Sequence, residues 1–131
     1  MSIDQMQYYM AKLAYETDSW DVAQMLAEGS TYVIVDGRTE AAYSQEHIPQ
    51  AINVPHRDIS QTTTAHLDKS KIYICYCDGI GCNASTKTAM KLLSLGFEVR
   101  ELLGGLDKWK RDGYATAGQT PQDGAEIVCG C

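Results

Sequence analysis

The sequence predicts an α/β fold of three layers, in which a central, mostly parallel sheet has helices on both faces. Three observations support this prediction. The chain has 131 residues, 44% of them hydrophobic, so it is long enough for one well-packed domain and too short for two. Short apolar runs alternate with segments of helical periodicity, and right-handed crossovers place such helices on both sides of a parallel sheet. No linker, internal repeat or low-complexity block divides this pattern.

An extra N-terminal helix is predicted over residues 4–16 and is expected to lie against the domain. Its apolar side chains recur at helical spacing; they are Met6, Tyr9, Met10 and Leu13. A second helix is predicted to follow a cap at Asp18 or Ser19 and to stop at Gly29. Its apolar face, which we expect to pack in the core or against another helix, consists of Trp20, Val22, Ala23 and Leu26.

The next segment is predicted to form a strand, a helix and a second, shorter strand. The run TYVIVDG, residues 31–37, is rich in β-branched residues, as is typical of a strand buried on both faces. TEAAYSQEH, residues 39–47, contains good helix formers. Pro49 and Pro55 then bracket a short strand at residues 51–54.

The same alternation continues to the end of the predicted domain. KIYICYC, residues 71–77, is a clear strand, and a helix is predicted over residues 84–96 with Gly96 as its C-cap. EVRELLGG, residues 98–105, is the fourth strand, and LDKWKRDGY, residues 106–114, is the closing helix. The side chains of these two helices that we expect in the core are Ala89, Met90, Leu92, Leu93, Leu106 and Trp109.

Composition and charge exclude several classes of function. A net charge of −6 and a pI near 4.9 argue against nucleic acid or an anionic membrane surface as a partner, since both select clustered Lys and Arg. The first residues lack the basic and apolar regions of a secretion signal, and no stretch approaches the length of a membrane span. Five cysteines, an odd number with uneven spacing, fit a reducing compartment better than a disulfide framework. We therefore expect a cytoplasmic protein.

The loop after the strand at residues 71–77 is the candidate site of chemistry. In parallel α/β sheets ligands bind outside the carboxyl ends of the strands, and Cys77 stands at such an end. Gly79 and Gly81 allow a tight curl in which backbone N–H groups converge on one sulfur, and a helix begins just beyond. These surroundings are expected to lower the pKa of the Cys77 thiol, so that it needs no neighbouring base. The alternative for Cys77 is a small buried residue that closes the strand, the role we expect for Cys75.

Three segments resemble the rhodanese-like sulfurtransferases, and the resemblance covers the chain from Trp20 to Tyr114. VIVDGRTEAAYSQEHIPQAINVP is similar to the family's first signature, and LGGLDKWKRDGY is similar to its last. Between them, YICYC with its turn and helix resembles the active-site segment. The matching positions of the two signatures are Asp36, Arg38, His47, Ile48, Pro49, Ala51, Asn53, Pro55, Gly104, Gly105, Trp109 and Gly113.

The resemblance implies a rhodanese-like fold and a sulfurtransferase in which Cys77 is catalytic. Such an enzyme takes a sulfane sulfur from a donor such as thiosulfate, a persulfide or a polysulfide and holds it as a Cys77 persulfide. It then passes the sulfur to cyanide, a thiol or a protein acceptor; no metal or cofactor is implied. The loop residues expected to bind substrate are Asp78, Gly79, Ile80, Gly81, Cys82, Asn83, Ala84 and Ser85. Structural roles near the site are expected for Asp36, Arg38 and His47.

The loop also departs from the family's common pattern. Ile80 stands where that pattern has Gly and Cys82 where it has Arg, and the segment up to Gly96 is longer than usual. Without a loop arginine, and in an acidic chain, we expect weak turnover of the thiosulfate dianion compared with persulfides or polysulfides. Asn83 stands where phosphatases related to this fold need the arginine that clamps a phosphate, which argues against dephosphorylation.

Several alternatives stay open. Cys82 is either a spacer or a second thiol that resolves the persulfide or forms a reversible disulfide. The whole protein could be a non-catalytic rhodanese-like binding module, although such a module is expected to lack the loop cysteine. It could also be a thiol-disulfide redox protein that uses Cys77 and Cys82, although four residues separate them and the usual redox motif has fewer.

These features divide the chain into three parts. We expect residues 1–17 to form the packed N-terminal helix, residues 18–115 the rhodanese-like domain, and residues 116–131 a flexible tail of linker-like composition that ends in CGC. Cys129 and Cys131 are expected to be exposed thiols of a frayed terminus. The alternative is a metal site or redox pair, for which Cys-x-Cys alone lacks ligands and has an unfavourable disulfide geometry.

Overall fold

Helices and strands alternate along the chain as predicted. The computed structural model describes residues 4–29 and 31–124. In chain order the elements are α1 (Gln5–Tyr15), β1 (Glu16–Thr17), α2 (Ser19–Glu28), β2 (Tyr32–Asp36), α3 (Glu40–Gln45), β3 (Ile52–Asn53), the 3-10 helix η1 (His56–Asp58), β4 (Ile72–Tyr76), α4 (Ala84–Ser94), β5 (Glu98–Leu102) and α5 (Gly105–Arg111). Strand β1 and helix η1 are additions to the predicted pattern. Across the two described ranges, no helix has the length and apolar character needed to cross a bilayer.

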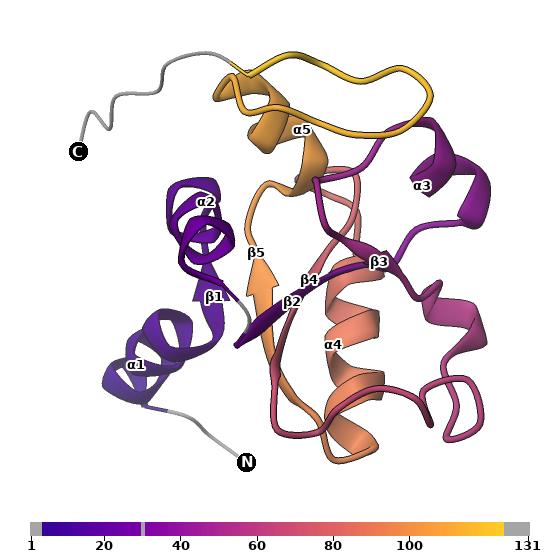
Figure 1. The fold of residues 1–131 in the computed structure, drawn as a ribbon. Coiled ribbons are helices and arrows are strands. Elements are labelled where there is room, and N and C mark those ends of the chain that lie inside the picture. The colour runs from indigo at the N-terminus through magenta and orange to yellow at the C-terminus, as the bar shows by residue number, and fades with distance from the viewer. Residues whose placement is uncertain (1–3, 30, 125–131) are drawn as a thin grey trace.

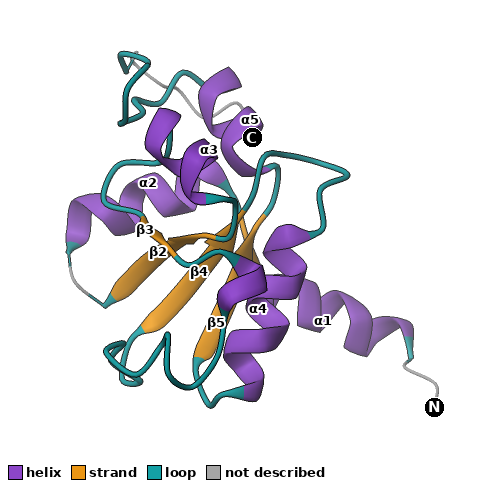
Figure 2. Ribbon diagram, turned by 90° about the vertical axis from the view of Figure 1, so that its right-hand side faces the viewer, coloured by secondary structure: helices purple, strands orange, loops and turns teal. Residues whose placement is uncertain are grey.

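The five strands form one parallel sheet in the order β1-β5-β4-β2-β3 (Figures 1 and 2). Strand β4 lies between β2 and β5, and Cys75 is in register with Val35 on one side and Glu101 on the other. Because all strands run in the same direction, the segments that follow β2, β4 and β5 leave from the same edge of the sheet. The predicted α/β architecture is confirmed, and the loop that begins at Cys77 lies at this edge.

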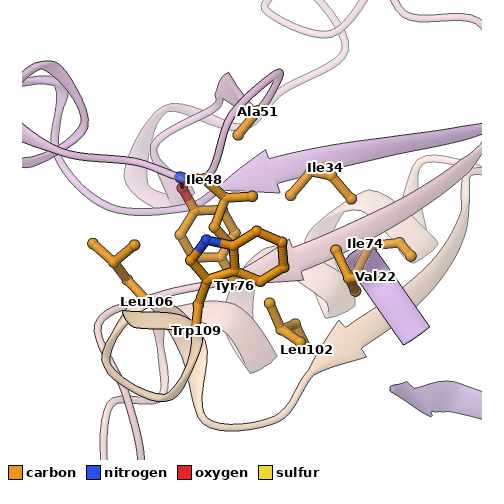
Figure 3. Close-up of a cluster of buried hydrophobic side chains, with 9 residues drawn as sticks. All are labelled: Val22, Ile34, Ile48, Ala51, Ile74, Tyr76, Leu102, Leu106 and Trp109. Carbon is orange, nitrogen blue, oxygen red and sulfur yellow. Dashed lines mark hydrogen bonds between the residues drawn. The ribbon is translucent and has the colours of Figure 1, made fainter. Parts of the chain in front are cut away.

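Each face of the sheet has its own apolar core, since successive side chains of a strand point to opposite faces. On one face, Ile34, Ile74 and Tyr76 cluster with Val22 of α2 and Trp109 of α5 (Figure 3). Full burial of one large apolar side chain of this kind stabilises the folded state by about 1.5–3 kcal/mol. This cluster therefore fixes α2 and α5 on the sheet.

The opposite face is covered by α4. Val35, Tyr73 and Cys75 pack there against Leu92 of α4 and Phe97, which directly precedes β5. Cys75 is completely buried, which matches the filler role predicted for it. The odd-numbered residues of β4 thus face α4, and this alternation directs Cys77 toward the same helix.

Helix α1 forms as predicted, but it does not bury the apolar side chains that were expected to face the domain. Those four residues are all exposed, Leu13 by 87%; they are Met6, Tyr9, Met10 and Leu13. The side of α1 that lies along the domain carries Tyr8, Ala11, Lys12 and Tyr15, which line a groove shared with α4 and β5. Arg100 of β5 lies over the Tyr15 ring at 5.9 Å, so tyrosine rings and the lysine stem make this contact in place of the predicted stripe.

Three other predictions about core residues are wrong. Trp20 is 38% exposed, and Met90 and Leu93 are exposed by 66% and 60%. Met90 and Leu93 line the groove that α4 shares with α1 and β5. Val22, Leu92, Leu106 and Trp109 are buried, as predicted.

Residues 116–122 fold back onto the domain instead of forming the predicted flexible tail. Ala117 and His47 form an antiparallel bridge with two hydrogen bonds of 2.9 Å. Figure 1 shows the segment in yellow, where it passes above α3 and α5. The Thr116 hydroxyl donates to Glu46 at 2.6 Å, and the Gln122 N–H donates to the Thr116 hydroxyl oxygen at 2.6 Å. Linker-like composition did not reveal these backbone partners. Cys129 and Cys131 lie outside the described residues.

Candidate active site

Cys77 directly follows β4 and is buried under its own loop, with only 2% of the residue exposed. Its Sγ lies 3.3 Å from the carbonyl oxygen of Cys82 and 3.6 Å from the Ser85 hydroxyl oxygen. The backbone N–H of Ser85 also points at the sulfur. The thiol therefore lies at the base of the loop, against the first turn of α4.

The loop curls because one glycine takes a conformation that other residues avoid. Gly81 has a φ of +94°, while Gly79 keeps an ordinary φ. The Cys82 N–H donates to the Gly79 carbonyl at 3.2 Å and closes the turn. The predicted curl is present. Of the two glycines that were predicted to form it, Gly81 has a positive φ and Gly79 does not.

The turn between β5 and α5 forms a second wall of the site. The Leu106 N–H donates to the Cys77 carbonyl at 2.9 Å, and the Asp107 N–H donates to the Asp78 carbonyl at 2.7 Å. A Cβ atom on Gly105 would lie 2.3 Å from the Cys77 carbonyl oxygen. Only glycine at position 105 allows the two backbones to approach this closely, so the second glycine of the LGG segment is required by the packing of the turn against Cys77.

A cavity of about 220 Å³ lies beside Cys77, between the loop and the end of β5. Five of the predicted substrate-binding residues line it, namely Gly79, Ile80, Gly81, Cys82 and Ser85. Besides Cys77 itself, the other lining residues were not predicted to belong to the site; they are Glu101, Leu102, Leu103, Gly104 and Gly105. Since parallel strands end at one edge of a sheet, the adjacency of β4 and β5 is the signal that could have identified this second group.

The other predicted loop residues lie elsewhere. Asp78 and Ala84 line a neighbouring cavity of about 430 Å³, and Cys82 lines both cavities. Asn83 lines neither of the two and precedes α4 without capping it through its side chain. Cys82 is thus the residue that separates the small cavity beside Cys77 from the larger one.

The ionisation of the two loop thiols differs from the prediction. Burial and the hydrogen bond to Cys82 raise the pKa of Cys77, although the Ser85 hydroxyl and backbone N–H beside the sulfur act in the opposite direction. Burial opposes the ionisation of Cys82, but the hydrogen bond from Cys77 and the N–H groups of Ala84 and Asp78 outweigh it and lower the pKa of Cys82. The prediction that the loop lowers the pKa of Cys77 is therefore wrong. The loop amides converge on Cys82, and desolvation dominates at Cys77.

Asp36 and Arg38 connect the end of β2 to the loop after β4. The completely buried Asp36 carboxylate accepts the Arg38 Nη2–H at 2.7 Å and the Tyr76 hydroxyl at 3.0 Å. Arg38 also donates to the Glu46 carbonyl at 2.6 Å and pairs with Asp78 at 3.1 Å. Burial disfavours the guanidinium charge, yet Asp36 outweighs it and raises the pKa of Arg38. These contacts suit a residue that positions the loop.

His47 lies away from both cavities. Its ring stacks on Tyr43 with centroids 3.9 Å apart, and its Nδ1 lies 2.6 Å from the Tyr43 carbonyl oxygen, which requires a proton on that nitrogen. Within the described ranges, no three His, Cys, Asp or Glu side chains gather as a metal ion would need.

Comparison with known proteins gives concordant matches. A family model described as the rhodanese-like domain matches residues 19–112. The thiosulfate sulfurtransferase GlpE of Coxiella burnetii is 32% identical over 103 residues, which cover 77% of this chain and 89% of that protein. GlpE of Pseudomonas syringae is 32% identical over 90 residues, covering 67% of this chain and 80% of its own length.

Solved structures agree with these sequence matches. A Bacillus halodurans protein known from its crystal structure has a TM-score of 0.85 and 40% sequence identity, covering 88% of this chain and 85% of that one. A rhodanese-like domain from an Anabaena protein, solved by NMR, has a TM-score of 0.71 and 29% identity, covering 87% of this chain and 91% of its own.

Proposed function

Because this chain belongs to the rhodanese-like domain family, we propose that it is a sulfurtransferase that carries sulfane sulfur as a persulfide on Cys77. One observation carries the proposal: Cys77 directly follows β4 and lines a cavity formed by its own loop and the Gly104–Gly105 turn. The names of the GlpE relatives support the same class of reaction.

The proposed reaction has two steps. The Cys77 thiolate attacks the outer sulfur of a donor, forms an S–S bond, and releases sulfite from thiosulfate or a thiolate from a persulfide. A cyanide ion or a thiolate then attacks the outer sulfur of the Cys77 persulfide, and Cys77 leaves as a thiolate. Desolvation in the small cavity favours this exchange over hydrolysis of the intermediate.

The cavity favours donors of low charge. Among its described lining residues, Glu101 is the only charged side chain, so a thiosulfate dianion meets no cation there. Persulfides and polysulfides are accordingly the donors we propose ahead of thiosulfate. Ile80 is 95% exposed and Leu103 47% exposed at the mouth, which supports a protein thiol as an acceptor besides cyanide and small thiols.

A thiol-disulfide function is the second candidate, and one contact favours it. The Cys77 thiol donates to the Cys82 carbonyl oxygen at 3.3 Å, so the two residues lie in contact, and their pKa values are shifted in opposite directions. Both are free thiols, as is Cys75. A reducing compartment such as the cytoplasm would maintain this form, and we propose that the protein acts there.

The test is the turnover of a sulfur donor by Cys77→Ser, with Cys82→Ser as the matched loop variant. We expect Cys77→Ser to lose sulfur transfer to cyanide or a thiol while keeping its circular dichroism spectrum, and Cys82→Ser to retain it. Full activity of folded Cys77→Ser would refute the assignment. Loss of activity in both variants, together with dithiol oxidation by the native protein, would favour the redox candidate.

A further inference from the structure

A chain of hydrogen bonds leads from Cys77 through the first turn of α4 to β5. The Cys77 thiol donates to the Ser85 Oγ at 3.6 Å, and the Ser85 hydroxyl donates to the Glu101 Oε2 at 2.7 Å. The Thr86 hydroxyl donates to the same carboxylate oxygen at 2.6 Å. No role was predicted for Glu101 from the sequence.

The fold positions each member of this chain. Ser85 is the second residue of α4, directly above the sulfur, and is 5% exposed. Glu101 lies on β5 in register with Cys75, two residues before Cys77 on the adjacent strand. Among the ion pairs of residues 4–29 and 31–124, none includes Glu101. Its carboxylate therefore accepts hydrogen bonds from two hydroxyl groups and pairs with no cation among these residues.

A proton acceptor is needed because Cys77 is desolvated. Burial keeps this thiol protonated at neutral pH, and the thiolate is the nucleophile. The other acceptor of the thiol proton, the Cys82 carbonyl, cannot carry the proton away. Ser85 can both accept a proton and pass on its own.

We propose that Ser85 and Glu101 form a proton relay that deprotonates Cys77 during sulfur transfer. The proposal rests on the sulfurtransferase function inferred above. Before the Cys77 sulfur attacks the donor, its S–H bond breaks and the proton moves to the Ser85 oxygen. The original Ser85 proton moves to Glu101 Oε2, so the products are a Cys77 thiolate, a Ser85 hydroxyl and a neutral Glu101 carboxylic acid. The step transfers two protons and no electrons, so it requires no oxidant.

The same path runs backwards in the second step. When an acceptor removes the outer sulfur, Cys77 is released as a thiolate, and Ser85 returns a proton to it while Glu101 ionises again. Ser85 touches the reacting sulfur and is thus a catalytic residue, whereas Glu101 acts through Ser85 and is a positioning residue.

The groups around the relay come from every neighbouring element. Glu16 of β1 is the register partner of Glu101, and its charge is paired with Lys12 of α1 at 2.9 Å. The other titratable neighbours of the two ends include Cys75 on β4 and Cys82 and Asp78 in the loop. The groove that Glu101 lines beside α1 adds Tyr8, Lys12, Tyr15, Glu98 and Arg100. Lys12 neutralises the charge of Glu16. The substitution Glu101→Gln therefore removes one carboxylate charge and leaves the other charges near Cys77 unchanged.

The test compares the native full chain with Glu101→Gln, Ser85→Ala and the double variant. Glu98→Gln is the matched control, because Glu98 is an exposed carboxylate of the same strand that pairs with Arg100. Inorganic polysulfide loads each protein in a single turnover between about pH 6 and about pH 10, and the mass of the Cys77 peptide reports the loading. Alkylation of Cys77 by iodoacetamide is followed in parallel, since it needs the thiolate and no sulfur donor.

We expect Glu101→Gln and Ser85→Ala to react about tenfold or more slowly at the acidic end, where the thiol needs a base. The rates should converge with the native rate at the alkaline end, where the thiolate forms without help. The double variant should be no slower than either single variant, and Glu98→Gln should follow the native protein. Glu101→Gln retains an oxygen for the Ser85 hydroxyl, so it tests the relay even where Ser85→Ala fails to fold.

A deficit that is equal at every pH would indicate a structural effect and overturn the relay, as would native rates in Glu101→Gln. The alkylation measurement separates this failure from failure of the proposed function. If the native protein takes up no sulfur but alkylation shows the pH-dependent deficit, the sulfurtransferase assignment fails and the relay stands.

Discussion

The Cys77 Sγ lies 3.3 Å from the carbonyl oxygen of Cys82, and the pKa values of the two thiols are shifted in opposite directions, upward for Cys77 and downward for Cys82. Cys77 is buried and faces only the small cavity, whereas Cys82 lines the small and the larger one. The loop therefore holds one thiol that is shielded from water and a second that also borders the larger cavity.

This contact predicts that Cys82→Ser loads sulfur on Cys77 at the native rate but loses it more slowly. A Cys82 thiolate can attack the inner sulfur of the Cys77 persulfide, form a Cys77–Cys82 disulfide and expel hydrosulfide. Without that thiol, spontaneous discharge should slow by about tenfold or more. Single-turnover loading and the hydrosulfide released afterwards are the measurements. Equal discharge in the two proteins would leave Cys82 as a spacer.

The ion pair of Asp36 and Arg38 predicts a large stability difference between two arginine variants. Arg38→Met leaves the fully buried Asp36 carboxylate without its cation and should lower the free energy of unfolding by about 3–5 kcal/mol. Arg111→Met breaks an exposed pair with Asp107 and should cost less than about 1 kcal/mol. Urea unfolding of both variants is the measurement, and similar losses would contradict the dominant role given to burial.

Cys75 predicts a loss of stability in alkali. Burial and the charge of Glu101 raise the pKa of Cys75 in the folded state, so its contribution is complete below the unfolded thiol value of about 8.5 and declines above it. In this range the unfolded state releases a proton that the folded state retains, at about 1.4 kcal/mol per pH unit.

Cys75→Ala should therefore lose stability less steeply than the native protein between about pH 8.5 and about pH 10. Urea unfolding at several pH values gives the two slopes, and the comparison of slopes is independent of the cavity that the substitution creates. Parallel slopes would mean that the Cys75 thiol ionises freely in the folded protein.

The lining of the small cavity predicts the donor preference. Thiosulfate should load Cys77 more slowly than a persulfide or polysulfide, and added salt should speed its reaction, because salt screens Glu101 and the net charge of −6. Loading rates at matched donor concentrations and two ionic strengths are the measurement. A strong preference for thiosulfate at low salt would reject this prediction.

The sheet and its helices were predictable because each buried strand is a nearly continuous apolar run. TYVIVDG and KIYICYC carry that pattern, and both form neighbouring strands of the parallel sheet. Helix α1 was harder to predict, because apolar and aromatic residues lie on two of its sides, Met6, Tyr9, Met10 and Leu13 on one and Tyr8, Ala11 and Tyr15 on the other. Periodicity alone does not decide which of them contacts β5. The bridge between Ala117 and His47 depends on backbone hydrogen bonds, which leave no mark on composition.

For the site, the position of Cys77 after a buried strand and before a helix was sufficient to place it at the sheet edge. Its ionisation was not predictable, because the balance between desolvation and amide hydrogen bonds depends on which sulfur the curled loop encloses. Glu101 was missed because a single acidic residue in a strand carries no motif. Its proximity to Ser85 arises only from the packing of α4 on β5.

The most direct test of a Cys77 sulfur carrier is mass spectrometry of the protein after treatment with a sulfur donor. We predict a gain of about 32 Da, the mass of one sulfur atom, on the peptide that contains Cys77. The adduct should form in the native protein and in Cys82→Ser, and it should be absent from Cys77→Ser. An adduct that persists on Cys82 in the Cys77→Ser variant, or no adduct on any loop cysteine of the native protein, would contradict the assignment.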